Sequence, residues 1–331
     1  MSNFEIVEKA FLAEPRFRIR QIKSLIFKDL IDNWNAATVL PAAMREKLKE
    51  IFPLKINSQL FVSPKKDTVR SLITLDDGLK IETVLMRHKA RNTVCVSSQV
   101  GCPLGCLFCA TGQMGFKRDL DKWEIVEQVL FFARLLKKEN QKVTNVVFMG
   151  MGEPFLNYEN VLGAIKILND KEGFNLGARH FSISTVGITG GIQKLAEEKL
   201  EINLAVSLHA PNDELRSKIM PCNKKYPIGE IFKAVDNYIK KTHRRVMVEY
   251  IMIKDLNDSD DSARELAKLI KKPLCFVNLI SYNPTGEYIA SPSARIKKFK
   301  EILEKNGVAV TERFRFGKDI KGACGQLAAR N

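Results

Sequence analysis

Between residues 94 and 313 the sequence alternates short apolar runs with longer amphipathic segments, and this alternation restricts the possible folds more than any other feature. The apolar runs, which we predict to be strands, are Val94–Ser98, Val143–Met149, His180–Thr185, Ile202–Leu208, Val246–Ile253, Cys275–Tyr282 and Val308–Arg313. The predicted helices are Trp123–Lys138, Tyr158–Leu168, Gly190–Glu198, Ile228–Lys241, Asp260–Lys271 and Ser293–Asn306. Apolar strands that alternate with helices are typical of a parallel sheet covered by helices. We therefore predict an α/β fold, either an open doubly wound sheet or a partial barrel, with function at the carboxyl ends of the strands.

The segments that precede this alternation have other patterns. Up to about residue 55 the pattern is helical, with periodic apolar positions in Phe4–Leu12, Ile19–Trp34 and Met44–Ile51. Short β-like runs follow at Gln59–Val62, Ser71–Leu75 and Lys80–Met86. We predict a helical N-terminal domain at 1–55, a β-rich connector at 56–87, the α/β core at 88–318 and a C-terminal tail at 319–331.

The chain is strongly basic, with 53 Lys and Arg side chains against 38 Asp and Glu and a net charge of +15. Basic soluble proteins often bind polyanions, because each neutralised phosphate releases a counterion. A merely solvated basic surface is the plainer alternative. The candidate residues for holding RNA are Arg16, Arg18, Arg20, Lys23, Lys28, Arg45, Lys47 and Lys49 in the N-terminal helices, His243–Arg245 and, less clearly, Lys117–Arg118.

No segment reads as a membrane span, because the most apolar stretch, 129–136, is interrupted by Arg134. The first residues include acidic side chains where a signal peptide would be basic and then apolar. We therefore expect a cytoplasmic protein whose seven cysteines are reduced. Clustered cysteines in that compartment indicate metal binding or catalysis.

Cys102, Cys106 and Cys109 form a C-x3-C-x2-C group directly after the first predicted core strand. A helix would also place these positions on one face, so a core helix is the alternative, but Gly101 and Pro103 favour an irregular loop. A structural zinc site normally has four ligands, and paired C-x2-C groups are absent from the sequence. Iron–sulfur clusters normally have four cysteine ligands, so three would leave one iron open to a small chelating molecule.

This spacing, in a chain of strand–helix units, resembles the radical S-adenosylmethionine (SAM) superfamily. Longer strings resemble the RlmN/Cfr family of radical SAM RNA adenine methyltransferases, and the resemblance covers nearly the whole chain. The matching strings are Cys95–Cys102, Cys109–Phe116, Met149–Pro154, Ser207–Ala210, Tyr282–Pro284 and Ala323–Leu327. The resemblance implies a partial (β/α)6 TIM-like barrel, a [4Fe-4S] cluster on Cys102, Cys106 and Cys109, and SAM bound at the open iron.

The residues expected to bind SAM follow predicted strands. Gly152 and Glu153 come after the second strand, where glycine lets a ligand approach the backbone and a carboxylate can accept hydrogen bonds from an amino group. An ordinary tight turn is the alternative. The resemblance implies that both residues contact the methionine end of SAM. It implies further SAM contacts at the ends of strands three, four and six, namely Ser184, Ser207, Leu208, His209 and Asn283.

Three residues acquire catalytic roles only through the resemblance. Cys324, in a Gly-containing tail, is by itself either a chance thiol or a nucleophile. The resemblance implies that a first SAM methylates Cys324, which then carries the methyl group. Cys95, otherwise a buried strand cysteine, is implied to form a transient disulfide with Cys324. Glu82, otherwise a surface strand residue, is implied to be the proton acceptor.

The implied reaction is a radical methylation, which is reasonable because an sp² adenine carbon is a poor nucleophile. A methylene radical formed on Cys324 adds to C2 of adenosine in 23S rRNA and in tRNA, and two SAM molecules are consumed. The target base has to leave its stack to reach the pocket. The resemblance also implies an electron donor such as flavodoxin or ferredoxin, and we expect a monomer.

Three alternatives stay open. Methylation of C8 is the closest one, although Gly112–Phe116 and Pro154 are more similar to the C2 enzymes. The others are a radical SAM enzyme with another substrate, which would need no methyl-carrier thiol, and a non-catalytic iron–sulfur RNA-binding module. The tail departs from the family pattern at Glu312, where an aliphatic residue is expected, and at Gly322, where Ala is usual. Cys222 and Cys275 fall in no matching motif, and we interpret them as structural.

Overall fold

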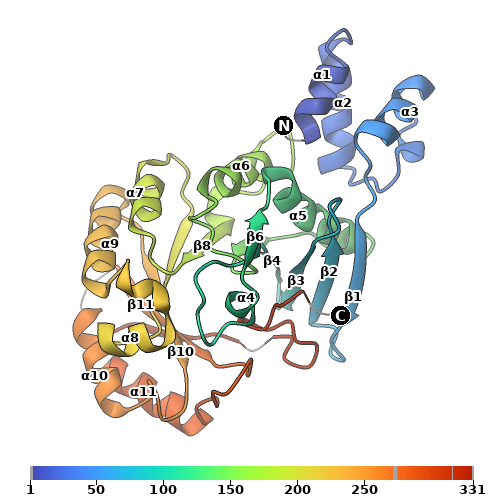
Figure 1. The fold of residues 1–331 in the computed structure, drawn as a ribbon. Helices are drawn as coiled ribbons and strands as arrows, with labels where there is room; N and C mark the ends of the chain where they lie inside the picture. Colours follow the sequence, from blue (N-terminus) through green and yellow to red (C-terminus); the bar gives the residue numbers. More distant parts are fainter. Residues whose placement is uncertain (1–2, 271–273, 315, 330–331) are drawn as a thin grey trace.

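The computed structural model describes residues 3–270, 274–314 and 316–329, and it is built on one curved ten-stranded sheet (Figure 1). The strand order is β1-β2-β3-β4-β7-β8-β9-β10-β11-β12. From β4 to β12 neighbouring strands are parallel, whereas β1 to β4 pair antiparallel. The parallel strands are β4 (Arg91–Val96), β7 (Asn145–Phe148), β8 (Phe181–Thr185), β9 (Asn203–Ser207), β10 (Val246–Met252), β11 (Cys275–Ser281) and β12 (Val310–Glu312). Among the described strands β1 and β12 are not paired with each other, so the barrel is partial.

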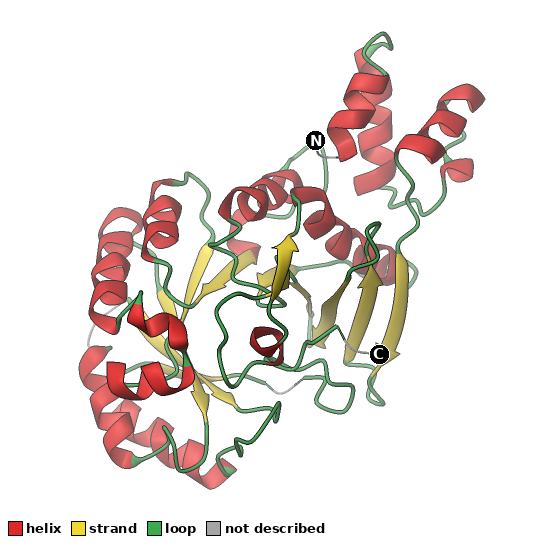
Figure 2. Cartoon of the chain, viewed as in Figure 1, coloured by secondary structure: helices red, strands yellow, loops and turns green. Residues whose placement is uncertain are grey.

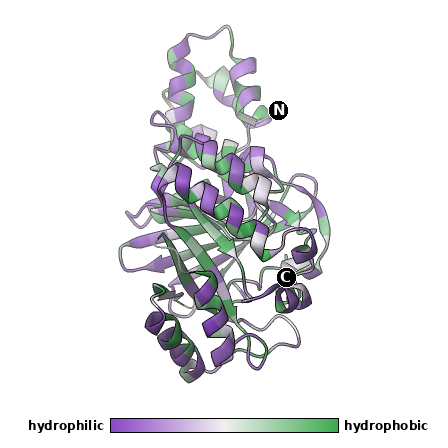
Figure 3. Cartoon of the chain, turned by 90° about the vertical axis from the view of Figure 1, so that its left-hand side faces the viewer, coloured by the Kyte–Doolittle hydropathy of each residue, from purple (hydrophilic) through white to green (hydrophobic). Residues whose placement is uncertain are grey.

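Helices cover the outer face of the parallel part (Figure 2). They are α5 (Lys122–Lys137), α6 (Tyr158–Asn169), α7 (Thr189–Glu197), α9 (Ile228–Thr242), α10 (Asp260–Leu269) and α11 (Ser293–Lys305). The start of α5 is encoded locally, because Asp121 and Glu124 form a capping box. The apolar face of each helix packs on the sheet and its polar face points outward (Figure 3).

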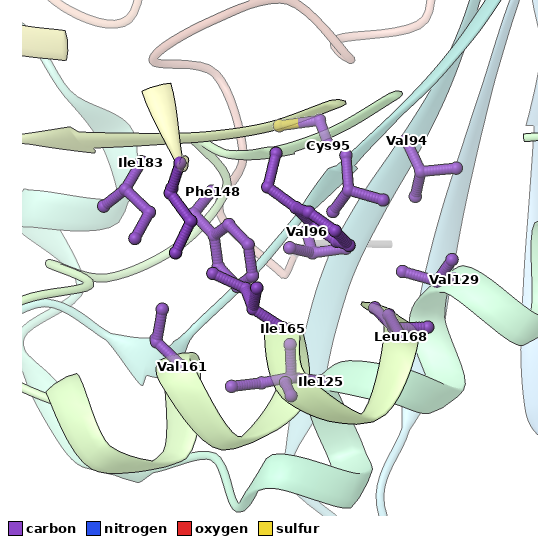
Figure 4. Packing of buried hydrophobic residues seen from close by; sticks show 14 of the residues in the cluster. Val94, Cys95, Val96, Ile125, Val129, Phe148, Val161, Ile165, Leu168 and Ile183 are labelled. Carbon is purple, nitrogen blue, oxygen red and sulfur yellow. The ribbon is translucent and has the colours of Figure 1, made fainter. Parts of the chain in front are cut away.

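The core between sheet and helices is built from alternate residues of the strands (Figure 4). Val94 and Val96 of β4 face α5 and α6, while Cys95 points away from these helices. This follows from the period of two in a strand, where successive side chains point to opposite faces. Because the helices cover the outer face, Cys95 points into the barrel interior.

The predicted connector belongs to the same sheet as the core. The strands β1 (Asn57–Val62), β2 (Thr68–Thr74) and β3 (Lys80–His88) form an antiparallel extension that joins β4 through the pairing of Val84 with Cys95. The connector strands therefore complete one wall of the barrel.

The N-terminal helices are α1 (Asn3–Ala10), α2 (Arg16–Phe27) and α3 (Ala42–Ile51), and they pack at the top of α5 (Figure 1). Aromatic rings join the two parts, since the ring centroids of Phe52 and Trp123 are 4.9 Å apart. Trp34 is buried and donates a hydrogen bond from its indole nitrogen to the carbonyl oxygen of Phe52 (2.7 Å). The N-terminal helices thus share one continuous core with the barrel.

The sequence prediction was wrong in one helix and missed several short elements. The predicted helix Ile19–Trp34 ends at Phe27, because Leu30 has a left-handed backbone (φ +49°) and 34–36 form a separate 3-10 turn. Among the missed elements are α4 (Ala110–Gln113), α8 (Asp213–Ile219) and the short antiparallel pair β5 (Gln99–Gly101) and β6 (Phe116–Asp119). Lys271, the predicted end of α10, lies outside the described residues. No helix in the described part of the chain is long and apolar enough to span a membrane.

Candidate active site

The loop that carries the three clustered cysteines is held between β5 and β6. The backbone N–H of Cys102 donates to the carbonyl oxygen of Gly115 (2.9 Å). Gly101 has φ +79°, and a Cβ there would collide with that same oxygen, so only glycine fits at this crossing. Further along, the N–H of Leu107 donates to the oxygen of Ile219 (3.0 Å). The short helix α4 (Ala110–Gln113) ends the loop.

The three thiols open into one cavity of about 150 Å³ at the carboxyl ends of the parallel strands. This cavity is also lined by Gly152, Glu153, Ser184, Ser207, His209, Glu249, Arg313 and Cys324. Among the described residues no group of His, Cys, Asp or Glu is arranged to hold a single metal ion. Three thiols around one cavity instead fit a multi-iron cluster, in which each cysteine binds a different iron. Burial raises the pKa of Cys102 to about 12, so a thiolate there requires a positive partner such as iron.

A fourth cysteine lies against this group, which the sequence interpretation did not foresee. The thiols of Cys106 and Cys222 share a hydrogen bond, and this contact together with burial raises the pKa of Cys106. Arg216 is fully buried nearby, and its guanidinium donates to neutral acceptors, among them the oxygens of Leu208 (3.1 Å) and Val186 (2.6 Å). No carboxylate of the described residues forms an ion pair with Arg216. Arg216 therefore places a buried positive charge close to Cys106 and Cys222, behind the wall of the cavity, where an anionic cluster would be stabilised.

Glu153 is buried and rigidly held in this cavity. Its two carboxylate oxygens accept hydrogen bonds from the backbone N–H groups of Phe155 (3.0 Å) and Val186 (2.8 Å). Burial nevertheless raises the pKa of Glu153 to about 7. The preceding Gly152 has φ +101°, and a Cβ there would lie 2.6 Å from the Cβ of Gln99. Glycine is therefore required to bring the carboxylate to this position.

Ser184 and Ser207 close two neighbouring strands and converge on an acid that sequence reasoning missed. The hydroxyl of Ser184 donates to Glu249 (2.6 Å), and the two serine oxygens are 3.2 Å apart. Arg313 pairs with the other oxygen of Glu249 (3.0 Å). A lone acid inside the apolar run of β10 was the available signal, because a buried carboxylate needs partners.

His209 and Leu208 contribute differently from each other. His209 has a left-handed backbone (φ +61°), and its Nδ1 accepts a hydrogen bond from the N–H of Ile251 (3.1 Å). Burial, helped by the charge of Arg216, lowers the pKa of His209 to about 3, so the ring is neutral. Leu208 is fully buried and is not among the residues that line the cavity, and its backbone oxygen accepts from Arg216.

The C-terminal tail folds back over the open end of the barrel, where it runs in front of the strands (Figure 1). The N–H of Ala110 and the hydroxyl of Thr111 donate to the oxygens of Gly325 (2.8 Å) and Leu327 (2.6 Å). Asn283 donates from its side chain to the oxygen of Cys324 (3.2 Å). Asn283 therefore holds the tail and lines a second, smaller cavity rather than the one that contains the three cysteines.

This second cavity, of about 30 Å³, brings Cys95 and Cys324 together with Arg313. Both cysteines are reduced in the structure. Burial raises the pKa of Cys95 to about 12, and the nearby Cys324 adds to the rise while Arg313 opposes it. Since Cys324 lines both cavities, it lies between the three clustered cysteines and Cys95. Residues 229 positions apart in the chain thus meet at one point.

Glu82 lies on β3 and is buried rather than exposed, with 1% of its surface accessible. One carboxylate oxygen pairs with the buried Arg70, and the other accepts the backbone N–H of Ala328 in the tail (2.9 Å). Glu82 lines neither cavity, and its link to Cys324 runs through the tail. The sequence interpretation did not identify Arg70, because nothing in the sequence shows that β2 and β3 pair with these side chains on one face.

Comparisons with known proteins agree with this arrangement. A family model described as the radical SAM superfamily matches residues 96–267. A protein of Dictyoglomus turgidum named "Probable dual-specificity RNA methyltransferase RlmN" is 48% identical over 318 residues, which cover 96% of this chain and 91% of that protein. A protein of Bacillus cytotoxicus with the same name is 45% identical over 320 residues, covering 96% and 88%. The crystal structure of a radical SAM methyltransferase from Sphaerobacter thermophilus superposes with a TM-score of 0.96 at 44% identity, covering 99% and 98% of the two chains.

Proposed function

Because the chain belongs to the RlmN family of radical SAM RNA methyltransferases, we propose that it methylates C2 of adenosine in 23S rRNA, at the peptidyl-transferase centre, and in tRNA next to the anticodon. The observation that carries this proposal is the meeting of Cys324 with Cys95 beside the cavity of the three clustered cysteines. A radical SAM enzyme that did not carry its methyl group on a thiol would not need this pair.

The cavity residues divide into cluster ligands and SAM contacts. Cys102, Cys106 and Cys109 would hold a [4Fe-4S] cluster with one iron open to SAM. Glu153, with Gly152 beside it, would accept hydrogen bonds from the amino group of SAM. Ser184, Ser207 and His209 of the same cavity are further proposed contacts, together with Leu208, which lies between two of them, and Asn283 at the neighbouring cavity. When bound, the cluster and SAM supply a carbon radical that can remove a hydrogen atom from a methyl group.

Cys324 and Cys95 divide the transfer between them. The sulfur of Cys324 takes a methyl group from one SAM and loses its own proton. After a hydrogen atom is removed from that methyl group, its carbon forms a bond to C2 of adenine. The sulfur of Cys95 then attacks the sulfur of Cys324, which breaks the bond between Cys324 and the methyl carbon and leaves a disulfide, and the methyl carbon takes the proton that Cys95 gives up. The unpaired electron of the adduct would return to the oxidised iron–sulfur cluster. Two electrons must reduce this disulfide before the next turnover.

Glu82 would accept the proton that leaves C2. Arg70 keeps one of its oxygens engaged, so the oxygen bonded to Ala328 is the one available for the proton. The tail must therefore release Glu82 when the adenosine enters. Because Cys324 and Ala328 lie on the same short tail, the entry of the base would also move the methyl carrier.

RNA would be held outside the cavity by basic residues of α1 to α3 and by His243–Arg245. A flavodoxin or ferredoxin is the proposed electron donor, and we propose that the enzyme acts as a monomer in the cytoplasm. The target adenosine would be unstacked in a loop, since the cavities lie inside the barrel mouth.

Mass spectrometry of RNA nucleosides tests the proposed function directly. Cells lacking this protein should lose 2-methyladenosine from both rRNA and tRNA, and expression of the intact chain should restore it. Loss of 8-methyladenosine instead would establish the C8 alternative. Unchanged methyladenosines of both kinds would contradict RNA methylation by this chain.

The affinity for SAM should fall as the pH decreases below about 7. The ionised form of Glu153 accepts hydrogen bonds from the SAM amino group, so protonation at its raised pKa of about 7 competes with binding. Below that pKa the dissociation constant should rise by about tenfold for each pH unit, and above it the affinity should level off. Equilibrium dialysis of SAM against the cluster-loaded protein from about pH 6 to about pH 8 measures this. The Glu153→Gln variant should bind more weakly and with a shallower slope, whereas affinity that rises on acidification would contradict the assignment.

A further inference from the structure

Three aromatic rings form a platform at the edge of the cavity that contains Cys95 and Cys324. The ring centroid of Phe314 lies 4.9 Å from that of His88 and 4.8 Å from that of Phe316, and the ring centroids of His88 and Phe316 are 5.9 Å apart. Phe314 and Phe316 both line the cavity. We call His88, Phe314 and Phe316 the aromatic platform.

The platform is open to solvent although it is apolar. Phe314 has 58% of its surface exposed, and His88 is also exposed. Apolar rings that stay exposed next to a reaction site are unusual in a soluble protein unless a ligand covers them. The platform takes no part in the transfer steps derived above, since none of its residues touches the three cysteines of the cluster loop or Glu153 in the described contacts.

Regular secondary structure holds the rings in place. His88 is the last residue of β3, and it pairs with Arg91 of β4. Just after β12, the backbone N–H of Arg313 donates to the oxygen of Leu279 on β11 (2.9 Å), which fixes the residue that precedes Phe314. His88 and the residue before Phe314 are therefore anchored to the sheet, which reduces the conformational entropy lost when these rings bind a partner.

Exposed cations lie on the three segments that meet beside the platform, and Asp319 is an exposed acid among them. The N–H of Arg87 donates to the oxygen of Asp67 (2.7 Å), which joins the turn before β2 to the end of β3. The tail packs on the same place, as Gly317 lies close to Thr68. The exposed cations of these three segments are Lys65, Lys66, Lys89, Arg91, Lys318 and Lys321. None of these six forms an ion pair with another described residue, so their charge is available to a polyanion.

We propose that the aromatic platform stacks an unpaired base of the RNA strand, next to the adenosine that is methylated. Every nucleobase presents a π-face, and exposed aromatic rings within a basic rim are the usual surface for unstacked bases. A protein partner would fit less well, because three rings surrounded by unpaired cations offer a small apolar area. The proposal rests on the proposed function, since it requires an RNA substrate whose target base leaves its stack.

The experiment compares Phe314→Ala with the wild-type enzyme on an RNA stem-loop that contains the target adenosine. A second set of RNAs carries one abasic nucleotide, on the 5′ or the 3′ side of the target. Stacking of one base contributes about 1–3 kcal/mol, so loss of either the ring or the base should raise the KM about 5- to 150-fold. The kcat should stay unchanged, because the ring takes part in none of the bond-making or proton-transfer steps derived above. Leu60→Ala, which truncates an exposed apolar residue on the outer strand β1, is the matched control and should leave both constants unchanged.

The combination of the two changes decides the outcome. At one flanking position the abasic nucleotide should raise the KM of the wild-type enzyme but not that of Phe314→Ala, because the ring and the missing base are stacking partners. Phe314→Trp should restore the KM, and quenching of its exposed indole should report RNA binding over the buried Trp34 and Trp123. An unchanged KM in Phe314→Ala, or additive losses at every position, would overturn the platform. Failure of the wild-type enzyme to methylate any RNA would instead overturn the proposed function.

Discussion

Replacing Cys324 by alanine should reduce RNA methylation by more than about 10⁴-fold, as expected when the only covalent carrier of a transferred group is removed. Cys95 cannot replace it, because Cys95 is buried in β4 and lines only the small cavity, not the one that contains the three clustered cysteines. Nor can the cluster ligands, whose sulfurs would be bonded to iron. The measurement is transfer of labelled methyl groups from SAM to an RNA fragment under reducing, anaerobic conditions.

The control for this variant separates chemistry from folding. Alanine at position 324 keeps the backbone oxygen that accepts from Asn283, so the tail should stay in place. The iron content and the affinity for SAM should match the wild-type values, since Cys324 is not a proposed cluster ligand. Cys275→Ala, another buried cysteine but remote from both cavities, should retain activity. Methylation at the wild-type rate by Cys324→Ala would refute the carrier mechanism.

Replacing Cys95 by alanine should trap the RNA on the protein. Without the thiol that attacks the sulfur of Cys324, the bond between this sulfur and the methylated base has no route to break. A covalent protein–RNA adduct should therefore accumulate to about one equivalent while free methylated RNA stays near background. Denaturing gel electrophoresis with labelled RNA detects the adduct, and mass spectrometry of the digested protein locates it.

Two further variants test where the covalent bond forms and what releases the product. The double variant Cys95→Ala/Cys324→Ala should form no adduct, which shows that the bond is made at Cys324. Glu82→Gln with Cys95 intact should slow the release of the product without a change in iron content. If Cys95→Ala turns over normally and leaves no adduct, Cys95 has no part in releasing the product.

Much of the fold follows from local sequence patterns. The predicted strands lie within a few residues of β4 and of β7 to β12, and the predicted core helices within a few residues of α5 to α7 and α9 to α11, because the hydrophobic period is a local property. The predicted helix through Trp34 was wrong, because the chain turns at Leu30. This turn lets Trp34 pack against Phe52 and donate a hydrogen bond to its oxygen, a contact between separate segments that the local pattern does not show. The pair β5 and β6 was missed since strands this short carry almost no periodic signal.

The site residues show the same division. The cysteine spacing and the glycines around Glu153 are local patterns, and they predicted which residues line the large cavity. The contacts of Glu249 with Ser184 and Arg313, and the contact of Cys222 with Cys106, join separate strands and loops, and no periodicity reports such pairs. Asn283, a proposed SAM contact, also donates to the oxygen of Cys324, and strand order alone does not indicate this contact between a strand end and the tail.

The sequence by itself determined the chemistry of this protein: three clustered cysteines, a separate cysteine in a C-terminal tail, and a chain of strand–helix units. It did so because residue type and local spacing specify reactivity and secondary structure. Only the tertiary structure decided which residues from distant parts of the chain come into contact. The tail is held to Asn283, the cysteine loop and Glu82 by hydrogen bonds that span from 41 to 246 positions of the chain, and this places Cys324 beside Cys95. Such contacts depend on how the barrel closes in space, and that closure is set by the packing of the whole core rather than by any segment.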